Sequence, residues 1–158
     1  MTRTGWAALA IITSLAIGGA QRIGADGSER ESVRHRRGCN DATLRGTYGI
    51  QITGTRPSAP GGAIESVVGV VIRTYDGRGS FTQIDNVKGS ISGTVPDREG
   101  FGTYQVDENC TGVAQLQPGP GILLEERMVI VDEGREIRTA TILPAPVMVT
   151  GVHKRISN

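Results

Sequence analysis

From residue 44 onward, hydrophobic and polar residues alternate along the chain with a period of two. In residues 44–54 this alternation places Tyr48, Ile50 and Ile52 on one side of the backbone. Alternation of this kind is typical of β-strands that bury one face. Short stretches rich in glycine and proline stand between these runs, and such stretches interrupt a ladder and form turns. The pattern therefore predicts an antiparallel meander of short strands.

A glycine, a small hydroxyl residue and an aromatic follow one another at three places, residues 46–48, 79–81 and 102–104. Glycine at the start of a strand lets a neighbouring backbone come close, and the aromatic that follows can enter a core. The 23 glycines and the small share of aromatics also favour short strands joined by tight turns. We therefore predict an all-β fold, a single antiparallel meander that closes into a barrel of about eight strands.

The middle of the chain contains the clearest turn signals. Residues 65–75 form the most hydrophobic predicted strand, and the Asp-Gly in residues 76–79 tolerates the positive φ of a tight hairpin. Residues 80–85 then return antiparallel. The next strand is predicted at residues 87–95, and residues 96–100 are predicted to form the turn that follows it.

Two adjacent carboxylates, Glu125 and Glu126, occur on a strand predicted at residues 122–132, after a Gln-Pro-Gly-Pro-Gly break at 117–121. Neighbouring residues of a strand point to opposite faces, so these two cannot serve one substrate as acid and base without a bulge. We interpret both as the hydrophilic face of an edge strand.

Residues 1–20 have a positive charge near the start, an apolar core and small residues at the end. This is the form of a cleavable signal peptide, with cleavage expected after Ala20 and Ala25 as a second site. The apolar run is shorter than the roughly 20 residues that a membrane-spanning helix needs. We therefore expect an exported protein, periplasmic or extracellular, without a stable membrane span after cleavage.

Residues 21–38 contain almost nothing apolar that could be buried. Such a segment cannot offset the entropy of ordering it, so a disordered linker is predicted there. The β-barrel domain is then expected to occupy residues 39–158. Within that range acidic residues outnumber basic ones, and the whole chain has a formal net charge of +1. A nucleic-acid-binding protein needs a dense basic face with stacking aromatics, so no nucleic-acid partner is expected.

The chain has two cysteines, Cys39 and Cys110. Behind a secretory leader, an even number of cysteines predicts a disulfide, although two free buried thiols are the alternative. Two thiols without nearby histidines make only half of a metal site, so no metal ion is expected. The two histidines, His35 and His153, lie in the predicted linker and near the end of the last strand, which argues against a catalytic triad. We predict no catalytic residues and no cofactor.

A barrel of about eight strands has an interior that side chains just fill or that holds one small ligand. Tyrosines beside inward glycines suit an apolar pocket with a few hydroxyl donors. The predicted pocket residues are Tyr48, Ile50, Gly89, Ile91, Gly93 and Tyr104. We expect a non-enzymatic protein that binds a small apolar or amphipathic ligand. The alternatives are a solid-core protein that binds a partner through its loops, and a barrel cyclase or isomerase that uses Tyr48, Tyr104 or Glu126.

The segment Leu44-Arg45-Gly46-Thr47-Tyr48, just after Cys39, resembles the opening of the calycin barrels, the lipocalins and avidins. The first strand of those proteins carries a Gly-x-Trp, and Tyr48 stands at the place of the tryptophan. The resemblance implies a barrel that can hold a small ligand inside. Lipocalins place an arginine of the last strand against the first-strand aromatic, and the resemblance assigns this role to Arg155. The glycine-rich meander is also similar to small exported bacterial proteins to which no activity is assigned.

Overall fold

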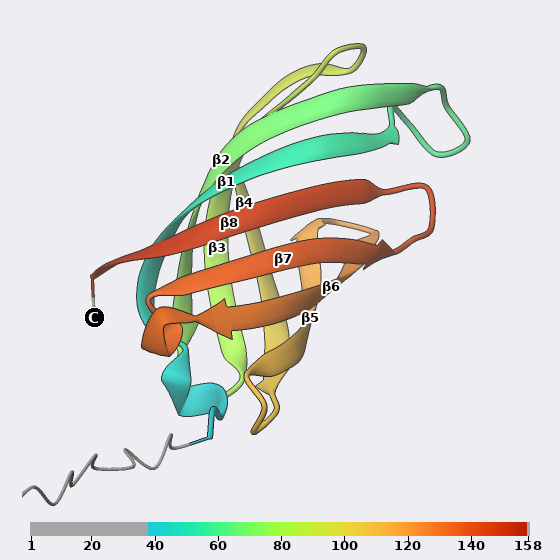
Figure 1. The fold of residues 1–158 in the computed structure, drawn as a ribbon. Helices are drawn as coiled ribbons and strands as arrows, with labels where there is room; N and C mark the ends of the chain where they lie inside the picture. The colour runs from blue at the N-terminus through green and yellow to red at the C-terminus, as the bar shows by residue number, and fades with distance from the viewer. Residues whose placement is uncertain (1–37, 158) are drawn as a thin grey trace, which may run out of the picture. The chain divides into compact units, whose positions relative to one another are not determined.

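A computed structural model describes residues 38–157, which form a closed antiparallel barrel (Figure 1). The strands are β1 (Arg45–Pro57), β2 (Ile64–Asp76), β3 (Ser80–Gly89), β4 (Gly93–Val106), β5 (Thr111–Gly119), β6 (Ile122–Val131), β7 (Glu136–Leu143) and β8 (Met148–Ser157). Two short 3-10 helices are η1 (Asp41–Thr43) and η2 (Asp132–Gly134). Each strand pairs with the next along the chain, and β8 returns to pair with β1. The predicted eight-stranded meander is therefore confirmed.

The predicted signal peptide, residues 1–20, lies outside the described residues, as does nearly all of the predicted linker, residues 21–38. Within the part of the chain that the structure describes, no helix has the length and apolar character needed to cross a membrane.

The three aromatics of the repeated glycine, hydroxyl and aromatic unit gather around one residue, Tyr75 of β2. The ring centroids of Tyr48, Phe81 and Tyr104 lie 5.2, 5.4 and 5.1 Å from that of Tyr75. Two of these contacts are edge-on, the geometry that aromatic quadrupoles favour. A Cβ at Gly102 would lie 2.4 Å from Cζ of Phe81, so this glycine, two residues before Tyr104, makes room for the Phe81 ring. The repeats thus build one aromatic core.

Helix η1 closes the end of the barrel next to this core. The Tyr104 hydroxyl lies 3.0 Å from the carbonyl oxygens of both Asp41 and Leu44, and it can donate to either. The sulfur atoms of Cys39 and Cys110 are at bonding distance, with their Cα atoms 4.9 Å apart. The predicted cysteine pairing is therefore present, and it ties the segment before η1 to the turn between β4 and β5.

Arg155 of β8 packs against Tyr48 of β1, the position that the calycin resemblance assigns to it. The guanidinium carbon lies 5.3 Å from the centroid of the tyrosine ring. Its Nε and Nη2 donate to the Tyr48 hydroxyl at 3.0 and 2.8 Å, and Nη2 also donates to the Thr43 carbonyl at 2.8 Å. The hydroxyl itself donates to the Gly134 carbonyl. Burial raises the pKa of Tyr48, and the contacts with Arg155 oppose only part of that shift.

The predicted strand at residues 87–95 is wrong, because the chain turns back in its middle. Strand β3 ends at Gly89 and β4 begins at Gly93, where the backbone has φ +80°. The intervening turn is held by Glu65, whose Oε2 accepts hydrogen bonds from the backbone N–H groups of Ile91 and Ser92 at 2.9 and 2.8 Å. That carboxylate lies 26 residues away in sequence from Ile91, so alternation alone could not reveal the turn.

Three further local predictions are corrected by the closed sheet. Residues 96–100 lie within β4 instead of forming a turn. The pairing of β4 with β3 shifts its register between Asp85 and Val87. Strand β5 continues through Pro118 to Gly119. Strand β6 is paired on both sides, with β5 and β7, so it is not an edge strand. A strand of a closed barrel has one face towards the outside and one towards the interior, and Glu126 lies on the interior face.

Candidate binding cavity

A cavity of about 440 Å³ occupies the half of the barrel away from η1. Its lining comes from the ends of β1, β3, β5 and β7 and from the starts of β2, β4, β6 and β8, which meet at the end opposite the aromatic core. Most of the wall is aliphatic, from Ile52, Val67, Val71, Val87, Val95, Leu116, Ile122, Leu124, Val147 and Val149. Small-molecule sites typically have volumes of about 300–1,000 Å³ and mainly apolar walls, and this cavity fits both criteria.

The floor of the cavity contains a buried ion pair that crosses the barrel, between Arg73 of β2 and Glu126 of β6. The Nη1 of Arg73 donates to Oε2 of Glu126 at 3.1 Å, and the two side chains are 3% and 10% exposed. The same Nη1 donates to the Tyr75 hydroxyl at 3.2 Å, and Nε donates to Oε1 of Gln83 at 2.9 Å. The guanidinium carbon also lies 4.3 Å from the Phe81 ring centroid. These contacts hold the arginine rigidly between the aromatic core and the cavity.

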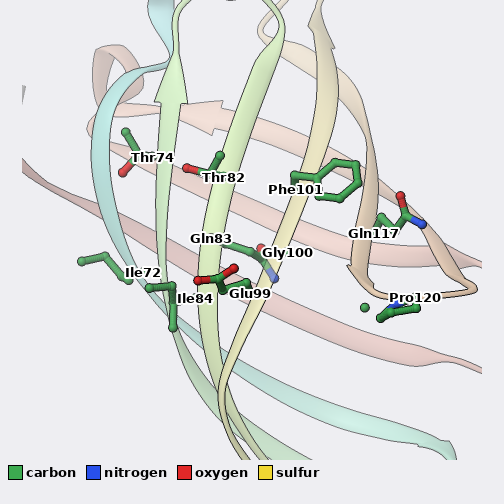
Figure 2. A pocket seen from close by; sticks show the side chains of 11 residues that line it. Ile72, Thr74, Thr82, Gln83, Ile84, Glu99, Gly100, Phe101, Gln117 and Pro120 are labelled. Carbon is green, nitrogen blue, oxygen red and sulfur yellow. The ribbon is translucent and has the colours of Figure 1, made fainter.

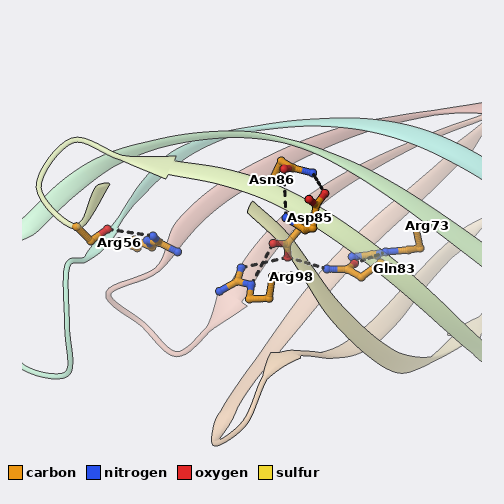
Figure 3. A network of polar contacts seen from close by, with 8 residues as sticks. Arg56, Arg73, Gln83, Asp85, Asn86 and Arg98 are labelled. Carbon is orange, nitrogen blue, oxygen red and sulfur yellow. Dashed lines mark hydrogen bonds and ion pairs between the residues drawn. The ribbon is translucent and has the colours of Figure 1, made fainter. Parts of the chain in front are cut away.

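The polar contacts continue from the floor along one wall towards the mouth (Figure 3). The side-chain amide nitrogen of Gln83 donates a hydrogen bond to Oδ2 of Asp85 at 3.2 Å. Asp85 in turn accepts two hydrogen bonds from Arg98, at 3.0 and 3.1 Å. Paired donation of this kind fixes the geometry of both side chains. Arginine and carboxylate therefore alternate along the wall, and the charges within it are compensated.

His153 lies beneath the floor, inside the closed half of the barrel. Its ring nitrogens are 3.3 Å from the Tyr75 hydroxyl and 3.3 Å from the Thr139 hydroxyl. Burial lowers the pKa of His153 well below its usual value, and the positive charge of Arg73 adds to this shift. Burial likewise raises the pKa of Tyr75, although Arg73 opposes that shift in part. Both side chains thus support the floor in their neutral forms and are not among the cavity-lining residues.

At the mouth, the carboxylate of Glu65 holds the β3–β4 hairpin and the rim together. It accepts from the Ser92 hydroxyl at 2.7 Å and from Nε of Arg56 at 3.0 Å, besides the backbone N–H groups of the turn. The backbone and side chain of Ser92, followed by the N–H of Ile91 and by Arg56, lower the pKa of Glu65 to about 2. A Cβ at Gly89 would lie 2.2 Å from Oε2 of Glu65, so glycine is needed where the carboxylate crosses the strand.

None of the six predicted pocket residues lines the cavity. Tyr48, Ile50 and Tyr104 belong to the core of the closed half. Gly89 lies beneath the carboxylate of Glu65, Ile91 is 60% exposed at the tip of the hairpin, and Gly93 follows it. The structure therefore does not bring these residues together at one site. Of the three groups named for a cyclase or isomerase, only Glu126 reaches the cavity.

The polar floor was missed, although the sequence contains a signal for it. Arg73 stands two residues before Tyr75, and Gln83 and Asp85 follow Phe81 at steps of two. These polar residues are therefore in phase with aromatics that enter the core. Polar residues in phase with an inward face indicate either a buried network or a site in the interior.

A second hollow, of about 780 Å³, lies on the outer side of β2 to β5 (Figure 2). Figure 2 shows Ile72, Ile84 and Phe101 around it, and these side chains are between 42 and 59% exposed. A hollow bordered by such exposed side chains is a feature of the curved outer surface. The interior cavity differs because it brings charged groups together out of water, and we take it as the candidate site.

Comparisons with family models, with curated proteins and with solved structures found no match to this chain. Among residues 38–157, no group of three or more histidine, cysteine or acidic side chains is placed to hold a metal ion. The functional interpretation therefore depends on the geometry of the cavity.

Proposed function

We propose that this protein binds a small apolar or amphipathic molecule inside its barrel, without catalysing a reaction. The observation that carries the proposal is the interior cavity of about 440 Å³ with aliphatic walls and a buried charged floor. Apolar walls with a few fixed polar groups are the usual composition of sites for small ligands. A cavity of this size weighs against the solid-core alternative.

The energetics of the floor support the same proposal. Burying an arginine and a carboxylate costs several kcal/mol per ion in desolvation, and apolar residues of the same volume are often as stable or more so. In the closed half, Tyr75 is surrounded mainly by buried aromatic and aliphatic residues, and the buried His153 beside it is kept neutral by a lowered pKa. The ion pair instead lies where both of its side chains line the open cavity, which is expected if the pair has a role in recognition.

We also propose that the protein is exported, with residues 1–20 removed. Disulfides form and persist mainly in oxidising compartments, so the bonding distance between Cys39 and Cys110 supports export. The test is the intact mass of the protein recovered from a bacterial periplasm. A chain that begins at Gln21 and is two hydrogens lighter than its reduced form is expected, whereas retention of residues 1–20 would overturn this part of the proposal.

The binding proposal is tested by native mass spectrometry after incubation with a lipid extract, using a matched pair of variants on β6. Leu124 lines the cavity, while Leu123 is 64% exposed on the outside. Leu124→Trp fills the cavity and is expected to abolish a ligand adduct that the wild type and Leu123→Trp retain. A wild type that never carries an adduct, or an adduct that survives Leu124→Trp, would refute the proposal.

A barrel cyclase or isomerase is the second candidate, because Glu126 places a carboxylate in an apolar cavity. Such an enzyme can act with few polar groups, since one carboxylate can take a proton from the bound molecule at one atom and return it at another. The two functions differ in what is released: an isomerase returns its bound molecule rearranged, while a binding protein returns it unchanged. Chromatography of the ligand before and after a long incubation distinguishes them, with Glu126→Gln as the control.

A further inference from the structure

The ion pair on the cavity floor uses only part of its hydrogen-bonding capacity. Nε and Nη1 of Arg73 donate to Gln83, Tyr75 and Glu126, but Nη2 has no hydrogen-bond acceptor among residues 38–157. On the carboxylate, Oε2 of Glu126 accepts from Arg73, and Oε1 has no donor within the same part of the chain. Every fully enclosed side-chain nitrogen or oxygen in the described residues has a partner. Both remaining atoms are therefore accessible, and both side chains line the cavity.

The floor thus presents one donor and one acceptor on adjacent side chains. An arginine N–H can only donate, and a carboxylate oxygen can only accept. A ligand group that satisfies both must accept from Arg73 and donate to Glu126. A hydroxyl or an amide does this, whereas a carboxylate only accepts and an ammonium only donates.

The charges around the cavity exclude a charged head group for a second reason. Arg73 is paired with Glu126, Arg98 with Asp85 and, at the mouth, Arg56 with Glu65, so the charges around the cavity are balanced. A carboxylate placed on the floor would lie beside Glu126, and an ammonium would lie beside Arg73, and in both cases the opposite charge of the floor is already paired. A buried charge without a partner costs far more than a buried neutral polar group that forms hydrogen bonds.

We propose that the cavity recognises amphipathic molecules with an uncharged head group that both donates and accepts hydrogen bonds, such as an alcohol. This inference rests on the proposed binding function and specifies its ligand class. The head group lies between Nη2 of Arg73 and Oε1 of Glu126, and the aliphatic tail extends along the valine, leucine and isoleucine wall towards the mouth.

The test compares three probes with the same tail, decanol, decanoate and decylamine, as competitors of the neutral fluorescent probe N-phenyl-naphthylamine at neutral pH. The last two are then charged, and decanol is not. Decanol is expected to bind at least about tenfold more tightly than either ion, a difference of about 1.4 kcal/mol. Equal binding of all three, or tighter binding of decanoate, would overturn the head-group inference while the binding function stands. Failure of all three to compete, together with a native mass without an adduct, would overturn the binding function itself.

A charge substitution on the floor provides the second measurement. Glu126→Gln keeps the shape and an acceptor for Arg73 but removes the negative charge, so the unpaired arginine should now attract an anion. Decanoate affinity is expected to rise about tenfold relative to decanol. Glu125→Gln is the matched control, because Glu125 lies on the outer face and pairs with Arg127 there. An unchanged preference in Glu126→Gln, with the fold shown intact by circular dichroism, would refute the assignment of the floor as the head-group site. The wild-type comparison decides the proposal even if the variant does not fold.

Discussion

The buried pair between Arg73 and Glu126 gives the sharpest prediction about stability. Arg73→Met removes the cation and leaves the carboxylate of Glu126, whose side chain is 10% exposed, without its partner. Breaking a buried pair from one side costs about 3–5 kcal/mol, because the remaining charge stays desolvated. The substitution also removes the donors to Gln83 Oε1 and the Tyr75 hydroxyl. For a domain of this size the loss corresponds to a fall in Tm of about 10–20 °C.

The double variant Arg73→Met/Glu126→Leu is expected to recover most of this loss. Replacing both members of a buried pair by apolar residues is often neutral or stabilising, since no charge is then left in the interior. Urea unfolding of the disulfide-bonded protein, followed by circular dichroism, measures the free energy of unfolding for each variant. The coupling between the two sites follows from the double-mutant cycle.

Arg127→Met is the control for this experiment. Arg127 pairs with Glu125 on the outside of β6, and its side chain is 63% exposed. An exposed pair contributes at most about 1 kcal/mol, so this change should be nearly silent. Additive losses in the double variant, or a loss in Arg73→Met no larger than that of Arg127→Met, would refute the argument that desolvation of the unpaired charge dominates.

Two further predictions concern the mouth and the closed end. Because the pKa of Glu65 is about 2 in the fold, its contribution to stability is complete above an unfolded value of about 4.5 and is lost as the pH falls towards 2. Acid titration of Glu65→Gln should therefore show a shallower loss over this interval, and an unchanged slope would contradict the role of this carboxylate. Reduction of the bond between Cys39 and Cys110, which are 71 residues apart, should cost about 4 kcal/mol in the loop-closure model. The double variant Cys39→Ser/Cys110→Ser should unfold at the same urea concentration as the reduced protein, and a midpoint equal to that of the oxidised protein would exclude a stabilising bond.

Local patterns in the sequence were sufficient to predict the barrel. Period-two alternation and the Asp-Gly turn after β2 act over a few residues, so their meaning does not depend on distant partners. The turn illustrates this, because Oδ1 of Asp76 accepts from the N–H groups of Arg78 and Ser80 at 2.7 and 3.0 Å. The cysteine pair was predictable for a different reason, since two cysteines allow only one pairing.

The position of the cavity was decided only by the tertiary structure. Alternation shows that a residue points inward, but the height at which it meets the others depends on the register and tilt of all eight strands. Tyr48 and Tyr104 point inward as predicted, yet they lie at the end that η1 closes, where they pack against Tyr75 in the core. Local sequence favours an edge strand for Glu126, because closure of the sheet between β1 and β8 cannot be inferred from its neighbours.

The polar floor shows the same limit most clearly. Arg73 and Glu126 are 53 residues apart, and the sequence contains nothing local that links them. Each is expensive to bury alone, so its charge favours placing it in water, even though Arg73 is in phase with the inward Tyr75. They become stable inside only because barrel closure brings β2 and β6 to opposite sides of one interior, where each charge compensates the other. The sequence by itself determined the class of fold and, along most strands, which residues face inward, while the closed sheet determined which inward residues meet and where the interior stays open.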